Sequence, residues 1–187
     1  EGDSELRPMA TFDNGWDGTD VIKSDPLPEA EDYYVGDWDG DGVDSLMWRT
    51  GNTFSYINKE GDKPVSFNYG RTGDVALVGD WDGDGKDSVA VRRGVVIYHK
   101  NALAGGNADD YFYFGRVDDA PLTGDWDGDG KDTISVRRGG SYFINNKLIG
   151  GAVDSFEFGD STYHAVVGDW DSDGIDTISL VDEKVEK

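Results

Sequence analysis

The chain has 187 residues, which is enough for one domain with a sizeable hydrophobic core. Its 39 acidic side chains outnumber 17 basic ones, and the formal net charge of −22 excludes nucleic acid and disfavours anionic membrane surfaces as partners, because phosphates are bound by clustered lysine and arginine. The absence of cysteine excludes disulfides and thiolate metal sites, and no apolar run is long enough to predict membrane insertion.

The amino-terminal part contains one strand signal ahead of a proline-containing linker. Residues 10–16 read ATFDNGW and place Phe12 where later segments of the chain have Tyr or Phe. The linker that follows includes Pro26 and Pro28. We expect residues 4–16 to contribute a closing β-strand.

A nine-residue acidic phrase, GDWDGDGxD, then appears four times. It begins at Gly36, Gly79, Gly124 and Gly168, at intervals of 43, 45 and 44 residues, and the last copy has Ser172 in place of a glycine. A recurrence this regular is typical of a stack or ring built from one structural unit. The four periods fill the chain, so we expect a single domain over residues 1–187.

The second period shows the unit clearly. Residues 75–79 are apolar and β-branched, and residues 88–93 alternate with the period of a half-buried strand. Residues 95–99 and 110–115 give two further strand signals, whereas no segment sustains a helical period with caps. Four short strands in each 44-residue unit predict an all-β fold, a β-propeller of about four four-stranded blades.

The two ends of the chain are incomplete in a complementary way. The fourth period stops after its second strand, residues 177–181, and the amino-terminal segment has no acidic loop of its own. We therefore expect residues 4–16 to complete the blade begun by residues 163–181, which removes the exposed sheet edges of an open array. The alternative is a partial arc of a larger propeller.

The acidic loops predict calcium sites. Counting from the first aspartate of each loop, positions 1, 3, 5 and 8 are aspartates, and glycines at positions 4 and 6 permit the positive φ of a tight turn. Alternating aspartates point inward, position 7 offers a main-chain carbonyl, and position 8 closes the shell. The predicted ligands of about four Ca²⁺ ions are Asp37, Asp39, Asp41, Val43 and Asp44; Asp80, Asp82, Asp84, Lys86 and Asp87; Asp125, Asp127, Asp129, Lys131 and Asp132; and Asp169, Asp171, Asp173, Ile175 and Asp176.

Three other interpretations of these loops fit the sequence less well. Plain Asp-Gly turns are common between strands, but four carboxylates per loop without a cation would form a destabilising cluster of like charge. An EF-hand needs an acidic twelfth position, which here holds Trp48, Val91, Val136 and Leu180. Zinc or copper would favour His or Cys ligands, and only His99 and His164 exist.

With these motifs, the repeat resembles the FG-GAP (VCBS-type) repeat of integrin α-subunit propellers and many bacterial exported proteins. The similarity covers about residues 10–181 and includes the aromatic-glycine pairs Tyr69-Gly70, Phe114-Gly115 and Phe158-Gly159. It implies a propeller with a calcium loop between the first two strands of each blade. The position-8 aspartate comes one residue earlier than in the family pattern, and family propellers usually have seven blades.

Aromatic and arginine side chains recur beside the loops. The position-2 tryptophans are expected to pack between neighbouring blades, with sugar stacking as the alternative; they are Trp38, Trp81, Trp126 and Trp170. The arginines that follow the second strands are expected to form ion pairs with nearby aspartates rather than to capture a ligand; they are Arg49, Arg92, Arg93, Arg137 and Arg138.

No catalytic constellation is found in the sequence. Two histidines and no cysteine provide no triad, and no phosphate-binding glycine loop is present. We therefore expect a non-catalytic, calcium-stabilised propeller module of a secreted or cell-surface bacterial protein that binds a glycan, a cell-wall polymer or an extracellular protein. The alternative is a structural spacer or assembly subunit that calcium makes rigid.

Overall fold

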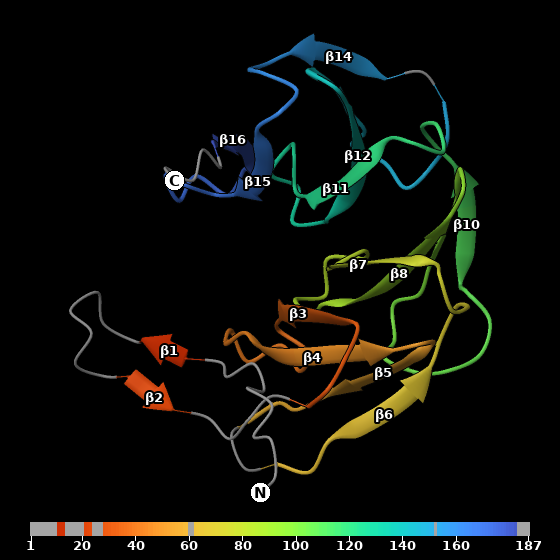
Figure 1. Cartoon of the computed structure of the whole chain (residues 1–187), viewed down its shortest axis with the longest axis vertical. Helices are drawn as coiled ribbons and strands as arrows, with labels where there is room; N and C mark the ends of the chain where they lie inside the picture. Colours follow the sequence, from red (N-terminus) through yellow and green to blue (C-terminus); the bar gives the residue numbers. More distant parts are fainter. Residues whose placement is uncertain (1–10, 14–20, 24–27, 60–61, 152, 183–187) are drawn as a thin grey trace, which may run out of the picture.

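The computed structural model of the chain describes residues 11–13, 21–23, 28–59, 62–151 and 153–182, and these residues form strands and turns without a helix (Figure 1). None of them therefore forms a helix that could cross a membrane. The strands are β1 (Thr11–Asp13), β2 (Val21–Lys23), β3 (Asp32–Gly36), β4 (Ser45–Thr50), β5 (Thr53–Tyr56), β6 (Val65–Asn68), β7 (Val75–Gly79), β8 (Ser88–Arg93), β9 (Val96–His99), β10 (Asp110–Tyr113), β11 (Ala120–Gly124), β12 (Thr133–Arg138), β13 (Ser141–Ile144), β14 (Asp154–Glu157), β15 (His164–Gly168) and β16 (Thr177–Val181).

The strands form antiparallel sheets in which neighbours in the chain are neighbours in space. Three sheets have four strands each: sheet I (β3–β6), sheet II (β7–β10) and sheet III (β11–β14). Sheet IV has two strands, β15 and β16, and the amino-terminal hairpin consists of β1 and β2. The repeat thus yields the all-β architecture that the sequence predicts, with each acidic loop between the first two strands of a sheet.

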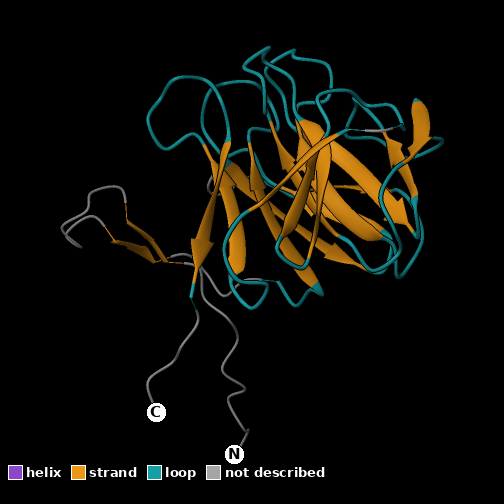
Figure 2. Cartoon of the chain, turned by 90° about the horizontal axis from the view of Figure 1, so that it is seen from above, coloured by secondary structure: helices purple, strands orange, loops and turns teal. Residues whose placement is uncertain are grey.

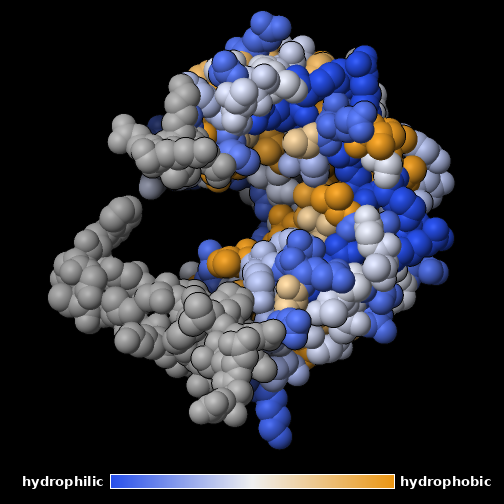
Figure 3. Space-filling model, viewed as in Figure 1, coloured by the Kyte–Doolittle hydropathy of each residue, from blue (hydrophilic) through white to orange (hydrophobic). Residues whose placement is uncertain are grey.

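The four sheets follow one another around an arc. Their first strands lie side by side in chain order, because β7 contacts both β3 and β11, and β11 contacts β15. Figure 1 shows the sheets fanned around this row of first strands, Figure 2 shows the strands from above, and Figure 3 shows the arc open on one side. The acidic loops, which begin where these first strands end, are therefore brought next to one another.

The hydrophobic core lies between consecutive sheets rather than within one of them. One cluster joins Trp38, Met47 and Phe54 of sheet I to Val89 and Val91 of sheet II. A second cluster repeats this contact between sheets II and III, with Trp81, Ile97 and Phe112 of sheet II against Ile134 and Val136 of sheet III. The expected packing of the position-2 tryptophans between sheets is confirmed for Trp38 and Trp81, which are 5% and 3% exposed, whereas Trp170 on sheet IV is 59% exposed.

The amino-terminal segment differs from the single closing strand expected over residues 4–16. Within the described residues, β1 covers Thr11–Asp13 and pairs with β2, and neither strand pairs with β15 or β16. The expectation did not include β2, whose three residues carry little pattern of their own. The remaining residues of that prediction, 4–10 and 14–16, lie outside the described part of the chain.

Candidate metal centre

Each acidic loop is folded around the carboxylate at position 1. In the first loop, Oδ1 of Asp37 accepts hydrogen bonds from the amides of Gly40 at 2.7 Å and Asp41 at 3.2 Å, and Oδ2 accepts one from Gly42 at 2.8 Å. Gly40 and Gly42 have φ values of 78° and 82°, which an L-residue with a side chain rarely adopts. The glycines are therefore required by the turn that wraps the amides around Asp37.

The other three loops repeat this geometry. The position-1 carboxylates Asp80, Asp125 and Asp169 each accept amides from positions 5 and 6 of their own loop, at 2.7–3.2 Å. The fourth loop holds Ser172 at position 4 with φ 63°, the one non-glycine residue with positive φ in the described structure. The same turn thus forms four times, with one strained substitution.

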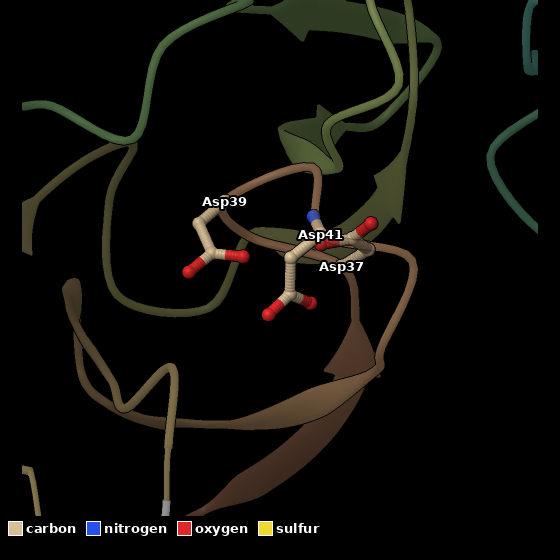
Figure 4. Close-up of side chains that lie close together, drawn as sticks. All are labelled: Asp37, Asp39 and Asp41. Atoms are coloured by element: carbon tan, nitrogen blue, oxygen red, sulfur yellow. The ribbon is translucent and has the colours of Figure 1, made fainter.

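Positions 1, 3 and 5 bring three carboxylates together in each loop (Figure 4). One oxygen from each member of a triplet lies within 4.8 Å of the others, in Asp37/Asp39/Asp41, Asp80/Asp82/Asp84, Asp125/Asp127/Asp129 and Asp169/Asp171/Asp173. Oxygens that bind one calcium ion at 2.3–2.6 Å are at most about 5.2 Å apart. Each triplet therefore has the spacing and the donor type to hold a metal ion.

In the first and fourth loops, the position-1 carboxylates Asp37 and Asp169 are kept in the charged form that a metal requires. Partial desolvation raises the pKa of Asp37, but hydrogen bonds from the amides of Gly42 and Gly40 outweigh it, and the net pKa lies below the ordinary value. In the fourth loop, the amide of Gly174 makes the main contribution to a lowered pKa of Asp169. The ionised Asp37 and Asp169 give these two loops a negative charge at neutral pH.

Position 7 supports the triplet through its amide. The amides of Val43, Lys86, Lys131 and Ile175 donate to Oδ1 of the position-5 aspartate of their own loop, at 2.9–3.0 Å. This contact orients the position-5 carboxylate. The predicted role of the position-7 carbonyl as a ligand stays a prediction.

Position 8 makes a contact that sequence reasoning missed. Oδ2 of Asp87 accepts the amide of Asp37 at 2.8 Å, and the amide of Asp87 donates to the carbonyl of Asp37 at 2.8 Å, so the second loop holds the first. The same pair of hydrogen bonds joins Asp132 to Asp80 and Asp176 to Asp125. We call this pair of hydrogen bonds the loop clamp.

The clamp gives the position-8 aspartates a role between loops. The carboxylate triplets do not include them, and one carboxylate oxygen of each of Asp87, Asp132 and Asp176 is already engaged by the preceding loop. Burial, reinforced by neighbouring carboxylates, raises the pKa of Asp132 to about 7. Asp44 is exposed, because no described loop precedes it.

The predicted arginine–aspartate ion pairs are confirmed for Arg49, Arg93 and Arg138, and the pairs of Arg93 and Arg138 fasten the turns between sheets. Arg93 binds Asp74 with two hydrogen bonds of 2.8 and 2.6 Å, and Arg138 binds Asp119 with two of 2.7 Å. Arg49 of sheet I lies 3.8 Å from the carboxylate of Asp32 and also donates to the carbonyls of Arg71 and Asp74 in the turn that leads to sheet II. Arg92 and Arg137 donate to carbonyls of the equivalent turns.

The turn aspartates could have been found from their spacing. Asp74 and Asp119 each stand five residues before the glycine that opens the next acidic loop, and both are buried. Repeat alignment of every polar position would have predicted a buried role for these two carboxylates.

Comparison of the chain with models of protein families, with curated protein sequences and with solved structures finds no match. The site is therefore interpreted from its own geometry. Four equivalent carboxylate triplets, joined by clamps along one row of loops, are its defining features.

Proposed function

We propose that the chain is a non-catalytic β-propeller module stabilised by calcium, in a secreted or cell-surface bacterial protein. The observation that carries this proposal is the fourfold carboxylate triplet, in which three charged oxygens lie close enough to share one cation. Oxygen-only donors on an exposed and adaptable loop favour calcium over zinc or copper, which prefer imidazole or thiolate. A dication in each triplet also offsets the repulsion among its carboxylates.

The arrangement of the sheets supports the propeller interpretation. Antiparallel four-stranded sheets whose first strands lie side by side, with apolar clusters between sheets, are typical of propeller blades. The FG-GAP resemblance of the sequence agrees with this arrangement. A calcium-dependent fold of this kind fits an external compartment, where calcium is abundant, and weak sites suffice there.

A binding role is supported by a hollow between sheets I and II. The hollow measures about 330 Å³, and its lining includes Tyr69, Arg71, Arg93, Tyr98 and Tyr111. Tyr111 is 56% exposed and its ring lies 5.9 Å from that of Tyr98. Exposed aromatic rings beside polar donors suit the stacking and hydrogen bonding of a saccharide, so a glycan or cell-wall polymer is the proposed ligand class, with an extracellular protein as the other class.

The second candidate function is a structural spacer. It is favoured by the regular clamps and Arg–Asp pairs, which stiffen the array whether or not a ligand binds. A glycan array probed with the calcium-loaded protein separates the two functions. Binding that is lost in Tyr111→Ala supports the module with a ligand, and absence of binding to any glycan or cell-wall preparation supports the spacer.

Isothermal titration calorimetry tests the metal assignment directly. Decalcified protein is expected to bind about four Ca²⁺ ions, and the variant Asp82→Asn/Asp84→Asn is expected to bind one fewer, since the second triplet then lacks two charged oxygens. The matched control is Asp109→Asn/Asp110→Asn, which removes two exposed aspartates outside the loops. A flat trace for the parent protein, or equal stoichiometry in both variants, would refute calcium binding by these loops.

A further inference from the structure

Sheet IV lacks half of the strands that the other sheets contain. Sheets I to III run from a first strand through an acidic loop to a second, third and fourth strand, whereas sheet IV contains only β15 and β16. In the described part of the chain, β16 pairs with β15 alone, although its counterparts β4, β8 and β12 each pair on both sides. One edge of sheet IV is therefore available for a further strand.

The amino-terminal hairpin resembles the third and fourth strands that sheet IV lacks. In sheet I the third and fourth strands pair in the register Thr53↔Asn68 and Phe54↔Phe67. The hairpin pairs in the register Thr11↔Lys23 and Phe12↔Ile22. A Thr-Phe dipeptide therefore begins both β1 and β5, the third strand of sheet I. Its two strands pair with each other and with no other described strand.

The connections of the hairpin also match those of a third and fourth strand. Residues 14–20 join β1 to β2, and the corresponding segment of sheet I is residues 57–64. The chain then passes from β2 to β3 through residues 24–31, as it passes from β6 to β7 through residues 69–74. Like β6, the fourth strand of sheet I, β2 is thus followed in the chain by the first strand of another sheet.

Exposed aromatic side chains mark the place where the missing strands belong. Phe112 and Phe114 of sheet II are 6% exposed, and Phe143, Leu148 and Val153, from the outer half of sheet III, pack against their cluster. The equivalent residues of sheet III, Phe156 and Phe158, are 46% and 44% exposed beside the two-stranded sheet IV. Among the described residues, this apolar surface is buried in sheet II, where the next sheet has four strands, and exposed in sheet III, where the next sheet has two.

We infer that hairpin β1–β2 is the outer half of sheet IV and docks on β16 of the same chain. In sheet I, the fifth residue of the second strand, Arg49, pairs with Phe54 of the third strand. The fifth residue of β16 is Val181, and Phe12 is the counterpart of Phe54, so Phe12 lies opposite Val181 in the docked state. This state differs from the present structure, in which the two sheets are separate, and it is independent of the proposed metal function.

An engineered disulfide tests this register. The chain has no cysteine, so Phe12→Cys/Val181→Cys introduces the sole pair of thiols, and directly opposed residues in an antiparallel sheet lie within disulfide range. Under air oxidation, free thiols are expected to fall from two to none per chain while the protein remains monomeric in a non-reducing gel. The control Asp13→Cys/Val181→Cys is shifted by one residue, which turns one thiol to the opposite face, and is expected to keep its thiols.

Two outcomes of the cross-linking would overturn the inference. Retention of both thiols in the first variant means that the hairpin does not reach β16, and a cross-linked dimer means that a second copy supplies the hairpin. As a measurement that needs no cysteine, Phe12→Lys and Val181→Glu are each expected to lower the melting temperature, and the double variant to recover part of the loss. Additive losses in the double variant would also contradict the inferred pairing.

Discussion

The indole N–H groups of Trp38 and Trp81 offer a sharp test of how the sheets pack. Both tryptophans occupy position 2 of an acidic loop and are buried between consecutive sheets. Nε1 of Trp38 donates to the carbonyl of Ser45 at 3.0 Å, whereas buried Nε1 of Trp81 has no hydrogen-bond partner among the described residues. The substitutions Trp38→Phe and Trp81→Phe therefore remove the same volume but change hydrogen bonding differently.

The expected losses of unfolding free energy follow from the burial of the two tryptophans. Each substitution removes roughly 50 Å² of apolar surface, or about 1 kcal/mol at 25 cal/mol per Å². Trp38→Phe additionally leaves the Ser45 carbonyl without this donor, which costs about 1–3 kcal/mol, whereas Trp81→Phe relieves an unpaired buried donor of similar penalty. We expect Trp38→Phe to lower the free energy of unfolding by at least about 2 kcal/mol more than Trp81→Phe, because the lost hydrogen bond and the relieved donor add in the difference.

Urea unfolding in the presence of calcium, followed by circular dichroism, measures both free energies. The denaturant slope should be unchanged, so that the midpoint alone reports stability. Val117→Ala is the control, because Val117 is 68% exposed and the change should fall within about 0.5 kcal/mol. Equal losses in the two tryptophan variants, or a larger loss in Trp81→Phe, would refute this account of the packing.

Three further predictions concern the metal, the turn pairs and the loop backbone. Chelation of calcium with EDTA should lower the melting temperature by at least about 5 °C, because a bound ion stabilises the folded state by mass action, and an unchanged melt in excess chelator would count against the metal sites. The hydrogen bond from Arg138 holds the pKa of Asp119 below its ordinary value, so this carboxylate stabilises the fold above its unfolded pKa of about 3.9 and the stabilisation is lost as pH falls through the folded pKa. Asp119→Asn should therefore cost about 1–3 kcal/mol at pH 7, and the cost should shrink as pH falls from about 4 through the folded pKa in pH-dependent urea unfolding, whereas a cost independent of pH would contradict the pairing. In the third loop, a Cβ on Gly128 would lie 3.1 Å from Cγ1 of Ile175 at φ 72°, so Gly128→Ser should destabilise by about 1–3 kcal/mol, whereas Ser172→Gly should be neutral or stabilising in the same assay.

The strands and acidic loops could be predicted because their signals are local and repeated. The expected strands at residues 75–79 and 88–93 are β7 and β8 to the residue, and the next two differ by one or two residues at their ends. Alternation, glycine placement and a constant period all act within a few residues of the chain. The carboxylate triplets follow for the same reason, because positions 1, 3 and 5 belong to one turn.

The loop clamp could not be predicted from spacing within one loop. Asp87 binds the amide of Asp37, which is 50 residues away, and nothing in the local pattern separates a ligand of its own loop from a partner of the preceding one. The hairpin at β1 and β2 was missed for a related reason, since three-residue strands carry too little pattern to reveal their partner. Both features depend on which segments become neighbours when the sheets pack.

The clamp and the triplet meet at the same residue, so the proposed metal binding would be linked to the packing of consecutive sheets. Asp80 organises its own loop through its carboxylate, while its amide and carbonyl are held by Asp132 of the next loop. A change that restricts the Asp80 side chain therefore also restricts the amide and carbonyl of Asp80, which Asp132 of the loop in sheet III binds. Since three consecutive pairs of loops share this arrangement, an ion bound in one triplet would also stabilise the contact between that loop and the next sheet.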